Sequence, residues 1–445
     1  MPPLVRLVRF PFVFLLTAFL AVPFGCTPTP KTDNGKVRLR VWSMWGGDEE
    51  KVFRRVLDEY NRTHPHVYLE NLGSVDDNKT VRALVAGAPP DLFTIADPSN
   101  LGALAANDAL LPLDDLFRDS GLSTDAFTRA SLSQCRFRGK LYAMPYLVDC
   151  IVLLYNKQSF RDAGLDPERP PRTLEEMVEY CRKLTVRGPD GRLKRIGLRP
   201  PEAINLLAIY GGRYFDPETG TITATDPRHI EAVAMYQRLM EAQGGNEAVE
   251  SFAQSFANQQ GSYNPFYLGQ VAMTFNGQWN TWWIQKYKPD VEYGIAPLPY
   301  PEKYPERAGT VWLGGNLFCI PKEGRHVREA WEFLRWTQTP EAQHLFADTI
   351  HGVPNIRASL ADRSLRTGEP WREQFGKFMD LSDSPNATHF PPMPVAMLYL
   401  NEITNAVDAV RYGRKTPEGA MRSVGTRVRK EMDRYRTDGP KEVTR

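Results

Sequence analysis

Short strands and helices alternate through residues 37–116, and this alternation constrains the fold more than any other feature of the 445-residue sequence. Apolar and polar residues alternate from Val37 to Trp42 as in a half-buried strand, and the segment "DEEKVFRRVLDEY" that follows has one apolar helical face. A second strand, a helix, a buried strand "DLFTIA" and a further helix come next. Units of this length predict an α/β fold with a mainly parallel sheet and helices on both faces.

The N-terminus has the features of an export signal. Two arginines precede an apolar stretch from Phe10 to Phe24, which is too short and too rich in proline to span a bilayer. Its end, Gly25-Cys26, resembles the lipobox of bacterial lipoproteins, although Pro23 stands where a lipobox has an aliphatic residue. We therefore expect a signal peptide over 1–25, acylation of Cys26 and a flexible tether over 26–36; the alternative is cleavage as an ordinary secreted protein.

Size and charge narrow the class of protein further. The roughly 420 residues after the signal exceed what one hydrophobic core usually serves, so two lobes are expected. The net charge of +2 is dispersed, and no basic run interleaved with aromatic residues points to nucleic acid. No His/Cys cluster has metal-ligand spacing, so neither metal nor cofactor is expected. Either disulfides or buried free thiols are compatible with the remaining cysteines, Cys135, Cys150, Cys181 and Cys319.

Enzyme motifs are missing from the sequence. No GxSxG elbow occurs, and none of the three Gly-Lys pairs is followed by Ser or Thr, which removes the P-loop. A glycoside hydrolase, which needs only two carboxylates in a sugar cleft, stays open as an alternative.

The segment "FNGQWNTWW" at residues 275–283 places three tryptophans beside a turn. Packing in a core is one explanation, because tryptophan buries much apolar surface. The other is a platform for a ligand with one apolar face and a polar edge, which describes a pyranose ring. We expect Trp279 to be the platform, and Trp282 and Trp283 to begin a helix that packs them inward.

Eight stretches in this order resemble the sugar-type extracellular solute-binding proteins of bacterial ABC importers, the maltose-binding-protein type. They are "VWSMWGG", "LVAGAPPDLFTIADPSNLGALAANDALLPLDDL", "GKLYAMPYLVDCIVLLYNKQSFRDAGLDP", "RTLEEMVEYCRKLT", "YLGQVAMTFNGQW", "YGIAPLPYP", "WLGGNLFCIPK" and "AWEFLRWTQTPEAQHLF". The resemblance implies a two-lobed periplasmic-binding-protein fold of type II that traps its ligand by hinge closure.

The resemblance also implies domain boundaries. The first lobe would hold residues 37–148 and 309–350, and the second 149–308 and 351–445. The chain would cross between lobes near "MPYLVD", "PLPYPEK" and "HGVPN", each with a proline that suits a defined turn.

Ligand contacts are expected from both lobes. Aromatic rings would cover the sugar face while carboxylates and amides bind hydroxyl groups. Asp97 ends a buried strand and also suits a turn, and Asp149 follows "MPYLV" where maltose-type relatives place an acidic contact. The glycines of "WLGGN" would let backbone approach the ligand. The full expected set is Trp42, Trp45, Asp97, Tyr146, Asp149, Trp279, Trp312, Gly315 and Asn316.

The sequence thus predicts a monomeric, non-enzymatic receptor outside the cytoplasm, held to the membrane by its lipid and delivering a mono- or oligosaccharide to an importer's permease subunits. Alternatives are a receptor for another polar solute, such as a polyol or a glycerol phosphate ester, and a secreted glycoside hydrolase. Nucleic acid is not an expected partner.

Overall fold

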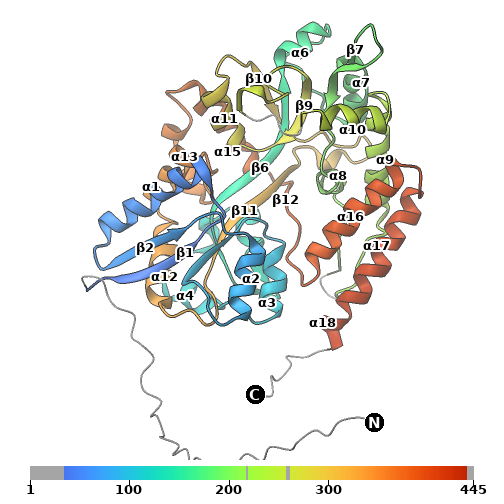
Figure 1. Cartoon of the computed structure of the whole chain (residues 1–445). Coiled ribbons are helices and arrows are strands. Elements are labelled where there is room, and N and C mark those ends of the chain that lie inside the picture. Colours follow the sequence, from blue (N-terminus) through green and yellow to red (C-terminus); the bar gives the residue numbers. More distant parts are fainter. Residues whose placement is uncertain (1–34, 217–218, 257–260, 438–445) are drawn as a thin grey trace, which may run out of the picture.

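A computed structural model describes residues 35–216, 219–256 and 261–437 of the chain (Figure 1). The expected signal peptide, Cys26 and nearly all of the expected tether lie outside these described residues. No described helix is both long enough and apolar enough to cross a membrane.

Within the described ranges, the strands form one ten-stranded sheet and a separate hairpin. Their order is β2-β1-β3-β11-β6-β9-β8-β7, with β10 beside β6 and β12 beside β11. The sheet strands are β1 (Val37–Trp42), β2 (Val67–Leu72), β3 (Leu92–Ile95), β6 (Met144–Asn156), β7 (Val186–Arg187), β8 (Leu193–Leu198), β9 (Val271–Asn276), β10 (Tyr293–Ala296), β11 (Val311–Cys319) and β12 (Ala387–Thr388). The hairpin is β4 (Arg136–Phe137) and β5 (Lys140–Leu141).

The sheet is mixed rather than mainly parallel. The predicted parallel pairing holds for β1 with β2 and β3, and for β8 with β9. The long strands β6 and β11 run antiparallel to each other and to the strands on either side, β9 and β3. The reason is that both strands carry the chain from one half of the molecule into the other, and they do so in opposite directions (Figure 1).

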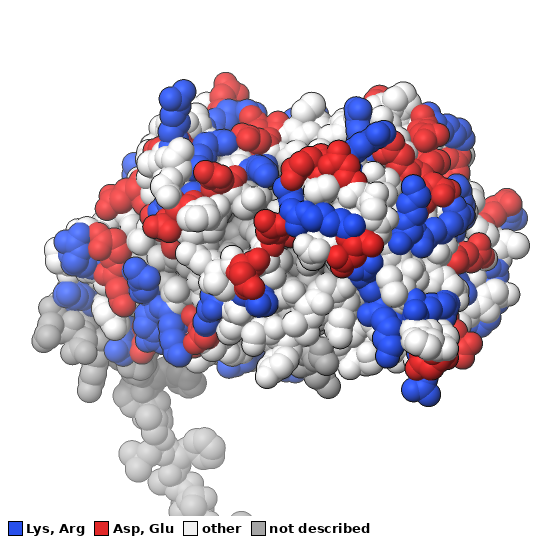
Figure 2. Space-filling view, turned by 90° about the horizontal axis from the view of Figure 1, so that it is seen from above, with Lys and Arg blue, Asp and Glu red and all other residues white. Residues whose placement is uncertain are grey.

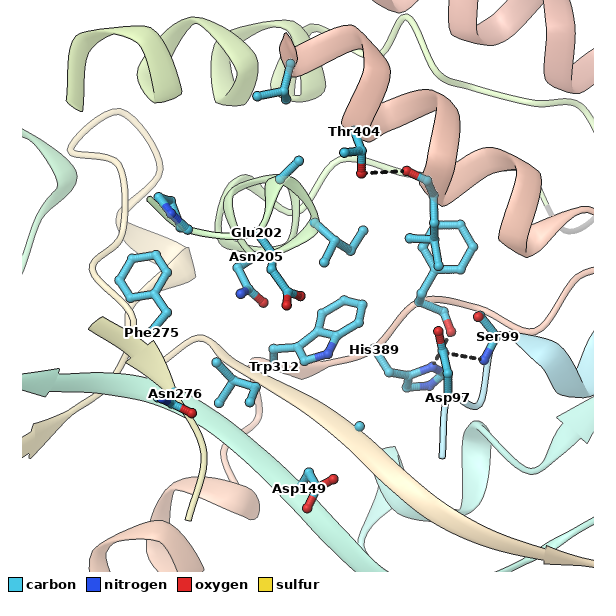
Figure 3. A pocket seen from close by; sticks show the side chains of 18 of the residues that line it. Asp97, Ser99, Asp149, Glu202, Asn205, Phe275, Asn276, Trp312, His389 and Thr404 are labelled. Atoms are coloured by element: carbon cyan, nitrogen blue, oxygen red, sulfur yellow. Dashed lines mark hydrogen bonds between the residues drawn. The ribbon is translucent and has the colours of Figure 1, made fainter. Parts of the chain in front are cut away.

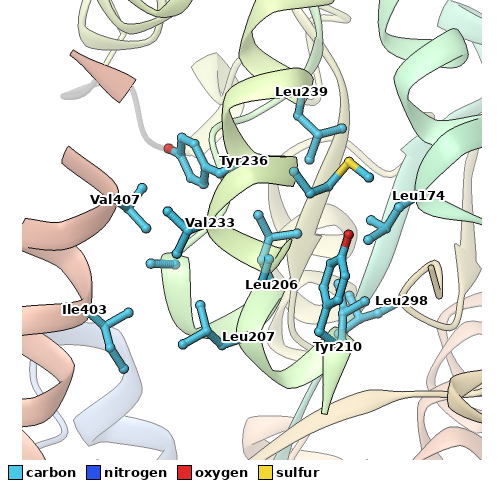
Figure 4. Close-up of a cluster of buried hydrophobic side chains, with 14 of the residues drawn as sticks. Leu174, Leu206, Leu207, Tyr210, Val233, Tyr236, Leu239, Leu298, Ile403 and Val407 are labelled. Carbon is cyan, nitrogen blue, oxygen red and sulfur yellow. The ribbon is translucent and has the colours of Figure 1, made fainter. Parts of the chain in front are cut away.

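The described residues form three hydrophobic cores. The first-lobe core contains buried residues of β1–β3, the start of β6 and the end of β11; the second-lobe core contains β8, most of β9 and the C-terminal helices. Figure 4 shows the second-lobe core, where Val233 and Leu207 face Val407 and Ile403, and Tyr210 lies on the other side beside Leu298. A third core lies under the middle of β6 and β11. The first two cores support a division into two lobes, which stays a proposal. Below, the first lobe is the part of the chain packed around the first-lobe core, and the second lobe is the part packed around the second-lobe core.

Helices surround each core. On the first-lobe core lie α1 (Gly47–Thr63), α2 (Asp77–Val85), α3 (Asn100–Ala106), α4 (Asp114–Asp119), α5 (Arg129–Ser133), α12 (Val327–Trp336) and α13 (Pro340–Ile350). On the second-lobe core lie α6 (Lys157–Asp162), α7 (Leu174–Leu184), α8 (Ala203–Tyr210), α9 (Pro227–Glu241), α10 (Asn246–Gln254), α16 (Ala396–Arg411), α17 (Pro417–Met432) and α18 (Arg434–Thr437). On the third lie α11 (Trp279–Tyr287), α14 (Arg357–Leu360) and α15 (Pro370–Ser382). Short 3-10 turns are η2 (Thr124–Ala126), η3 (Gly261–Tyr263), η4 (Pro305–Arg307) and η5 (Arg363–Leu365).

Polar side chains start several of these helices. Thr173 and Asp226 accept a hydrogen bond from a backbone N–H in the first turn of α7 and α9, as N-cap residues do. The four described cysteines are buried and unpaired, so the disulfide alternative is wrong for them. On the face seen in Figure 2, basic and acidic side chains are intermixed, consistent with the dispersed charge of the sequence.

Candidate ligand-binding cleft

A cavity of about 860 Å³ lies between the two lobes (Figure 3). Its walls follow the carboxyl ends of β3, β8 and β9, at 96–99, 199–205 and 274–276, and β6 and β11 cross its floor. Ligands bind beyond the carboxyl ends of strands in open α/β sheets, as the sequence analysis expected. Helix α16 of the second lobe closes the side opposite the floor.

Aromatic rings line the cavity from separate elements. Trp279 starts α11 and Trp312 lies on β11. Phe275 is the last residue but one of β9, and Phe390 follows β12. In Figure 3 the indole of Trp312 stands in the middle of the cavity, with Glu202 and Asn205 on one side and Asp149 on the other. Apolar faces next to carboxylates and amides make a site that can hold a ring with an apolar face and polar edges.

Trp279 is positioned by the turn that precedes it. A Cβ at residue 277 would overlap the six-membered ring of Trp279, so only glycine lets the indole fold back over the turn. Among the described residues, Trp279 is in none of the three hydrophobic cores. The ring is therefore held beside the cavity rather than used for packing a core.

Asp149 lies on β6 opposite Gly314 of β11. Its two oxygens accept hydrogen bonds from Gln278 Nε2 (2.7 Å) and Asn316 Nδ2 (3.1 Å). Burial raises its pKa to about 6, and the two amide donors oppose this rise. The position above Gly314 is open, since only Trp312 Nε1 lies within 4.0 Å of a Cβ placed there. A ligand can therefore approach the backbone beside Asp149.

The remaining acids of the cavity differ in their surroundings. Asp97 accepts a hydrogen bond from the Ser99 N–H (2.9 Å) and its carboxylate is exposed to the cavity. Asp408 forms an ion pair with Arg411 Nε (3.0 Å), and Arg411 also contacts Glu250. Arg411 is thus already neutralised by carboxylates.

A smaller cavity of about 260 Å³ adjoins the first, and both are lined by Ala96, Asp149 and Trp279. Its other walls include Trp45 and Glu49 of the first lobe and Trp282 and Trp283 of α11. Burial, and next the charge of Asp149, raise the pKa of Glu49. The cleft therefore has a wide part and a narrow part that meet at Asp149.

The lobes touch at both ends of this cleft. At the wide end, Gly102 of α3 lies against the backbone of Met393, and Ser99 Oγ lies 3.3 Å from Met397 Sδ. At the narrow end, Lys286 of α11 forms an ion pair with Asp48 of α1 (2.6 Å). In this structure the two lobes are therefore in direct contact at both ends of the cleft.

We expect Gly102→Ala to weaken ligand binding about tenfold. A Cβ at this position would lie 2.6 Å from Met393 Cα, so the added methyl group would force the lobes apart at a cost of about 1 kcal/mol or more. Small-angle X-ray scattering should show a loss of ligand-induced compaction. Gly425→Ala is the matched control, because its Cβ would meet only side chains, at 3.5 Å. Unchanged affinity in Gly102→Ala would contradict the role of this contact.

The structure brings six of the nine expected contact residues to the cleft. The wide part contains Asp97, Trp312, Asp149 and Trp279, and the last two also line the narrow part, together with Trp45 and Asn316. Asn316 is 2 % exposed and holds Asp149 rather than standing free.

Three expected contact residues line neither cavity. Trp42 shares a face of β1 with Arg38 and Arg40, away from the buried face, and its ring lies 5.6 Å from Lys79 Nζ. Tyr146 is fully buried among core rings and its hydroxyl accepts a hydrogen bond from Trp45 Nε1 (3.1 Å). It therefore positions Trp45.

Gly315 is the third of these, and its neighbour Gly314 takes the expected place. Side chains alternate along a strand, so Trp312, Gly314 and Asn316 share the cleft-facing side of β11. A Cβ at Gly315 would instead collide with the amide of Gln134. Of the Gly-Gly pair, the strand register therefore places Gly314 and not Gly315 at the cavity.

Trp282 and Trp283 do lie on a helix, as predicted, but they are not fully inward. Both are half-buried and line the narrow cavity; Trp283 also packs on the third core. Sequence reasoning missed Arg199, Glu202, Asn205, Asn276, His389 and Thr404, which line the wide cavity. Two signals were available in the sequence. Arg199–Asn205 directly follow a strand, and Asn276 lies in the segment "FNGQW" beside Trp279. His389 and Thr404 reach the site only through tertiary packing.

Two α/β lobes joined by crossing strands, with an aromatic and polar cavity at their junction, define a protein that binds a solute between its lobes. The chain belongs to the bacterial extracellular solute-binding protein family, whose model matches residues 46–344. Its place of action is therefore outside the cytoplasm.

Individual relatives are distant but cover nearly the whole chain. An arabinooligosaccharide-binding protein of Bacillus subtilis is 22% identical over 432 residues, 92% of this chain and 96% of its own. The sn-glycerol-3-phosphate-binding periplasmic protein UgpB of Pectobacterium atrosepticum is 23% identical over 429 residues, 88% and 91% of the two chains. The structure of CpMnBP1 with mannotriose bound superposes with a TM-score of 0.74 at 25% identity, covering 88% of this chain and 100% of that one.

Proposed function

We propose that the protein is a carbohydrate receptor of an ABC importer. The observation that carries this proposal is the wide cavity, in which the indoles of Trp279 and Trp312 lie near the carboxylates of Asp97, Asp149 and Glu202. Such rings cover the C–H face of a pyranose while carboxylates accept hydrogen bonds from its hydroxyl groups. The relatives with bound or named oligosaccharides support the same class of ligand.

The cavity size favours more than one sugar ring. About 860 Å³ is in the upper part of the range of roughly 300–1,000 Å³ that small-molecule sites occupy. The narrow cavity extends the cleft further. We therefore propose an oligosaccharide, bound when the lobes close around it and released to permease subunits when they open.

A glycerol phosphate ester, which UgpB is named for, fits the charges less well. Phosphate groups are held by Arg, Lys or helix N-termini. In the wide cavity Arg411 is paired with Glu250 and Asp408. Among the described lining residues, Arg199 is then the Arg or Lys side chain that forms no ion pair. Three acids of the same lining oppose its charge: Asp97, Asp149 and Glu202. Net negative charge in the cleft disfavours a phosphate.

A thermal-shift screen of the purified protein tests the proposal. A saccharide at 100 times its dissociation constant should add roughly 2.7 kcal/mol to the free energy of unfolding, and glycerol phosphate esters should add less. The hit should be recovered unchanged after long incubation, because the proposed role is binding without turnover. Stabilisation by phosphate esters alone, or release of shorter sugars, would overturn the proposal.

We also propose that Cys26 carries the lipid that holds the receptor at the membrane. The apolar stretch before Gly25-Cys26 and the polar segment after it support this. Mass spectrometry of the protein from its native membrane should show a diacylglyceryl group on an N-terminal Cys26. An unmodified N-terminus at another residue would contradict acylation, and Cys26→Ser is the matched variant that should appear in the soluble fraction.

A further inference from the structure

The narrow cavity combines an unusual number of indoles with two acids. It is lined by four tryptophans from both lobes: Trp45, Trp279, Trp282 and Trp283. Glu49, in the first turn of α1, and Asp149, on β6, add the carboxylates. Indole faces attract cations more strongly than any other side-chain ring, and carboxylates accept charge-assisted hydrogen bonds.

No basic side chain of the described residues lines this cavity. Asp149 is held by two neutral amides, and Glu49 forms no hydrogen bond or ion pair with another described side chain. Both residues are half-buried, and removing a carboxylate from water without a counter-ion costs free energy. The two acids therefore leave negative charge in the cavity that the described protein residues do not compensate.

Lys286 lies close to the narrow cavity but already forms an ion pair with an acid outside it. Its ammonium pairs with Asp48 and lies 4.7 Å from the ring centroid of Trp282 and 5.7 Å from that of Trp283. Its charge is thus balanced at the rim of the cavity by an acid that does not line it. The position of Lys286 also shows that the rings of Trp282 and Trp283 can have an ammonium group as a neighbour.

We propose that the narrow cavity binds a protonated amine carried by the ligand, which makes the solute an amino sugar or an oligosaccharide with an amino-sugar unit. The proposal rests on the proposed carbohydrate function and narrows it. The ammonium group donates hydrogen bonds to Glu49 and Asp149, and the surrounding indoles cover its C–H neighbours and its charge. The neutral remainder of the ligand occupies the wide cavity beside Trp312.

Three trisaccharides with one linkage test this directly: the β-1,4 trimers of glucosamine, N-acetylglucosamine and glucose. They differ in the group at carbon 2, which is a protonated amine, a neutral amide or a hydroxyl. Isothermal titration should give a dissociation constant at least tenfold lower for the glucosamine trimer than for either neutral trimer. Equal or weaker binding of the glucosamine trimer would overturn the amine subsite, and so would a thermal-shift panel in which only neutral sugars bind.

Glu49→Gln is the variant that localises the effect. It keeps the size of the side chain and removes the charge, so the preference for the amine should fall by at least fivefold. Glu50→Gln is the control, since the Glu50 carboxylate contacts Arg54 and Asn71 instead of the cavity. A preference that persists in Glu49→Gln would overturn the proposal. Failure of every saccharide to bind the parent protein would instead overturn the carbohydrate function itself.

Discussion

Trp279→Ala is expected to weaken saccharide binding about 30-fold, or about 2 kcal/mol, while leaving the melting temperature of the unliganded protein nearly unchanged. The reason is location. Trp279 is half-buried, lines both parts of the cleft and belongs to none of the three cores among the described residues, so the part of its ring that stays exposed after folding is covered only by ligand. Isothermal titration and a thermal melt of the same sample measure the two quantities.

Trp331→Ala is the matched control. This tryptophan is 7 % exposed, lies in the first-lobe core and lines neither cavity, so its removal should lower the melting temperature through a loss of about 3 kcal/mol or more. Its saccharide affinity, measured well below that melting temperature, should match the parent. If Trp279→Ala melts as early as Trp331→Ala, or binds as tightly as the parent, the platform role is wrong.

Asp149→Asn should have opposite effects on binding and stability. Binding of a saccharide should weaken about 30-fold, since the carboxylate would give up a charge-assisted hydrogen bond worth about 2 kcal/mol. Stability should rise at pH 7.5 by about 1 to 2 kcal/mol. Burial raises the folded-state pKa of Asp149 to about 6, so ionising the folded protein costs free energy that asparagine does not incur. Part of this gain is offset, because the asparagine amide can accept only one of the two hydrogen bonds that Gln278 and Asn316 donate to Asp149.

The stability gained in Asp149→Asn should depend on pH. The folded state holds a proton on Asp149 between the usual carboxyl pKa of 3.8 and about 6, so the parent loses stability as the pH rises through this window. At pH 4 the carboxyl is protonated in the folded state and about half ionised in the unfolded state, so most of the cost of ionising it is gone and the variant should be no more stable than the parent. Urea unfolding at pH 4 and pH 7.5 tests this; an equal gain at both values would show that burial of the charge is not the cause.

Local sequence patterns were enough to predict much of the fold. The alternation in "VRLRVW" and the apolar face of "VFRRVLDEY" became β1 and α1, because period and burial are local properties. The mixed sheet was missed because the direction of β6 and β11 follows from how the chain crosses between lobes, which no window of a few residues contains.

The cleft was predicted only in part, for a related reason. Asp97 and Trp279 follow strand ends, where an α/β sheet places its ligands, so position along the chain was informative. Gly315 was chosen over Gly314 because strand register was unknown, and Tyr146 was placed in the site although its ring packs beneath Trp45. Thr404 comes from a helix more than 100 residues beyond α11 in the chain, and only folding brings it to the cavity.

The most direct test of the account is a crystal structure of the protein with the saccharide that stabilises it most in the thermal-shift screen. We predict electron density for the sugar in the cavity between the lobes, with rings against Trp279 and Trp312 and hydroxyl groups on Asp97 and Asp149. A saccharide bound on the outer surface of either lobe, with the cleft filled only by water, would contradict the central claim.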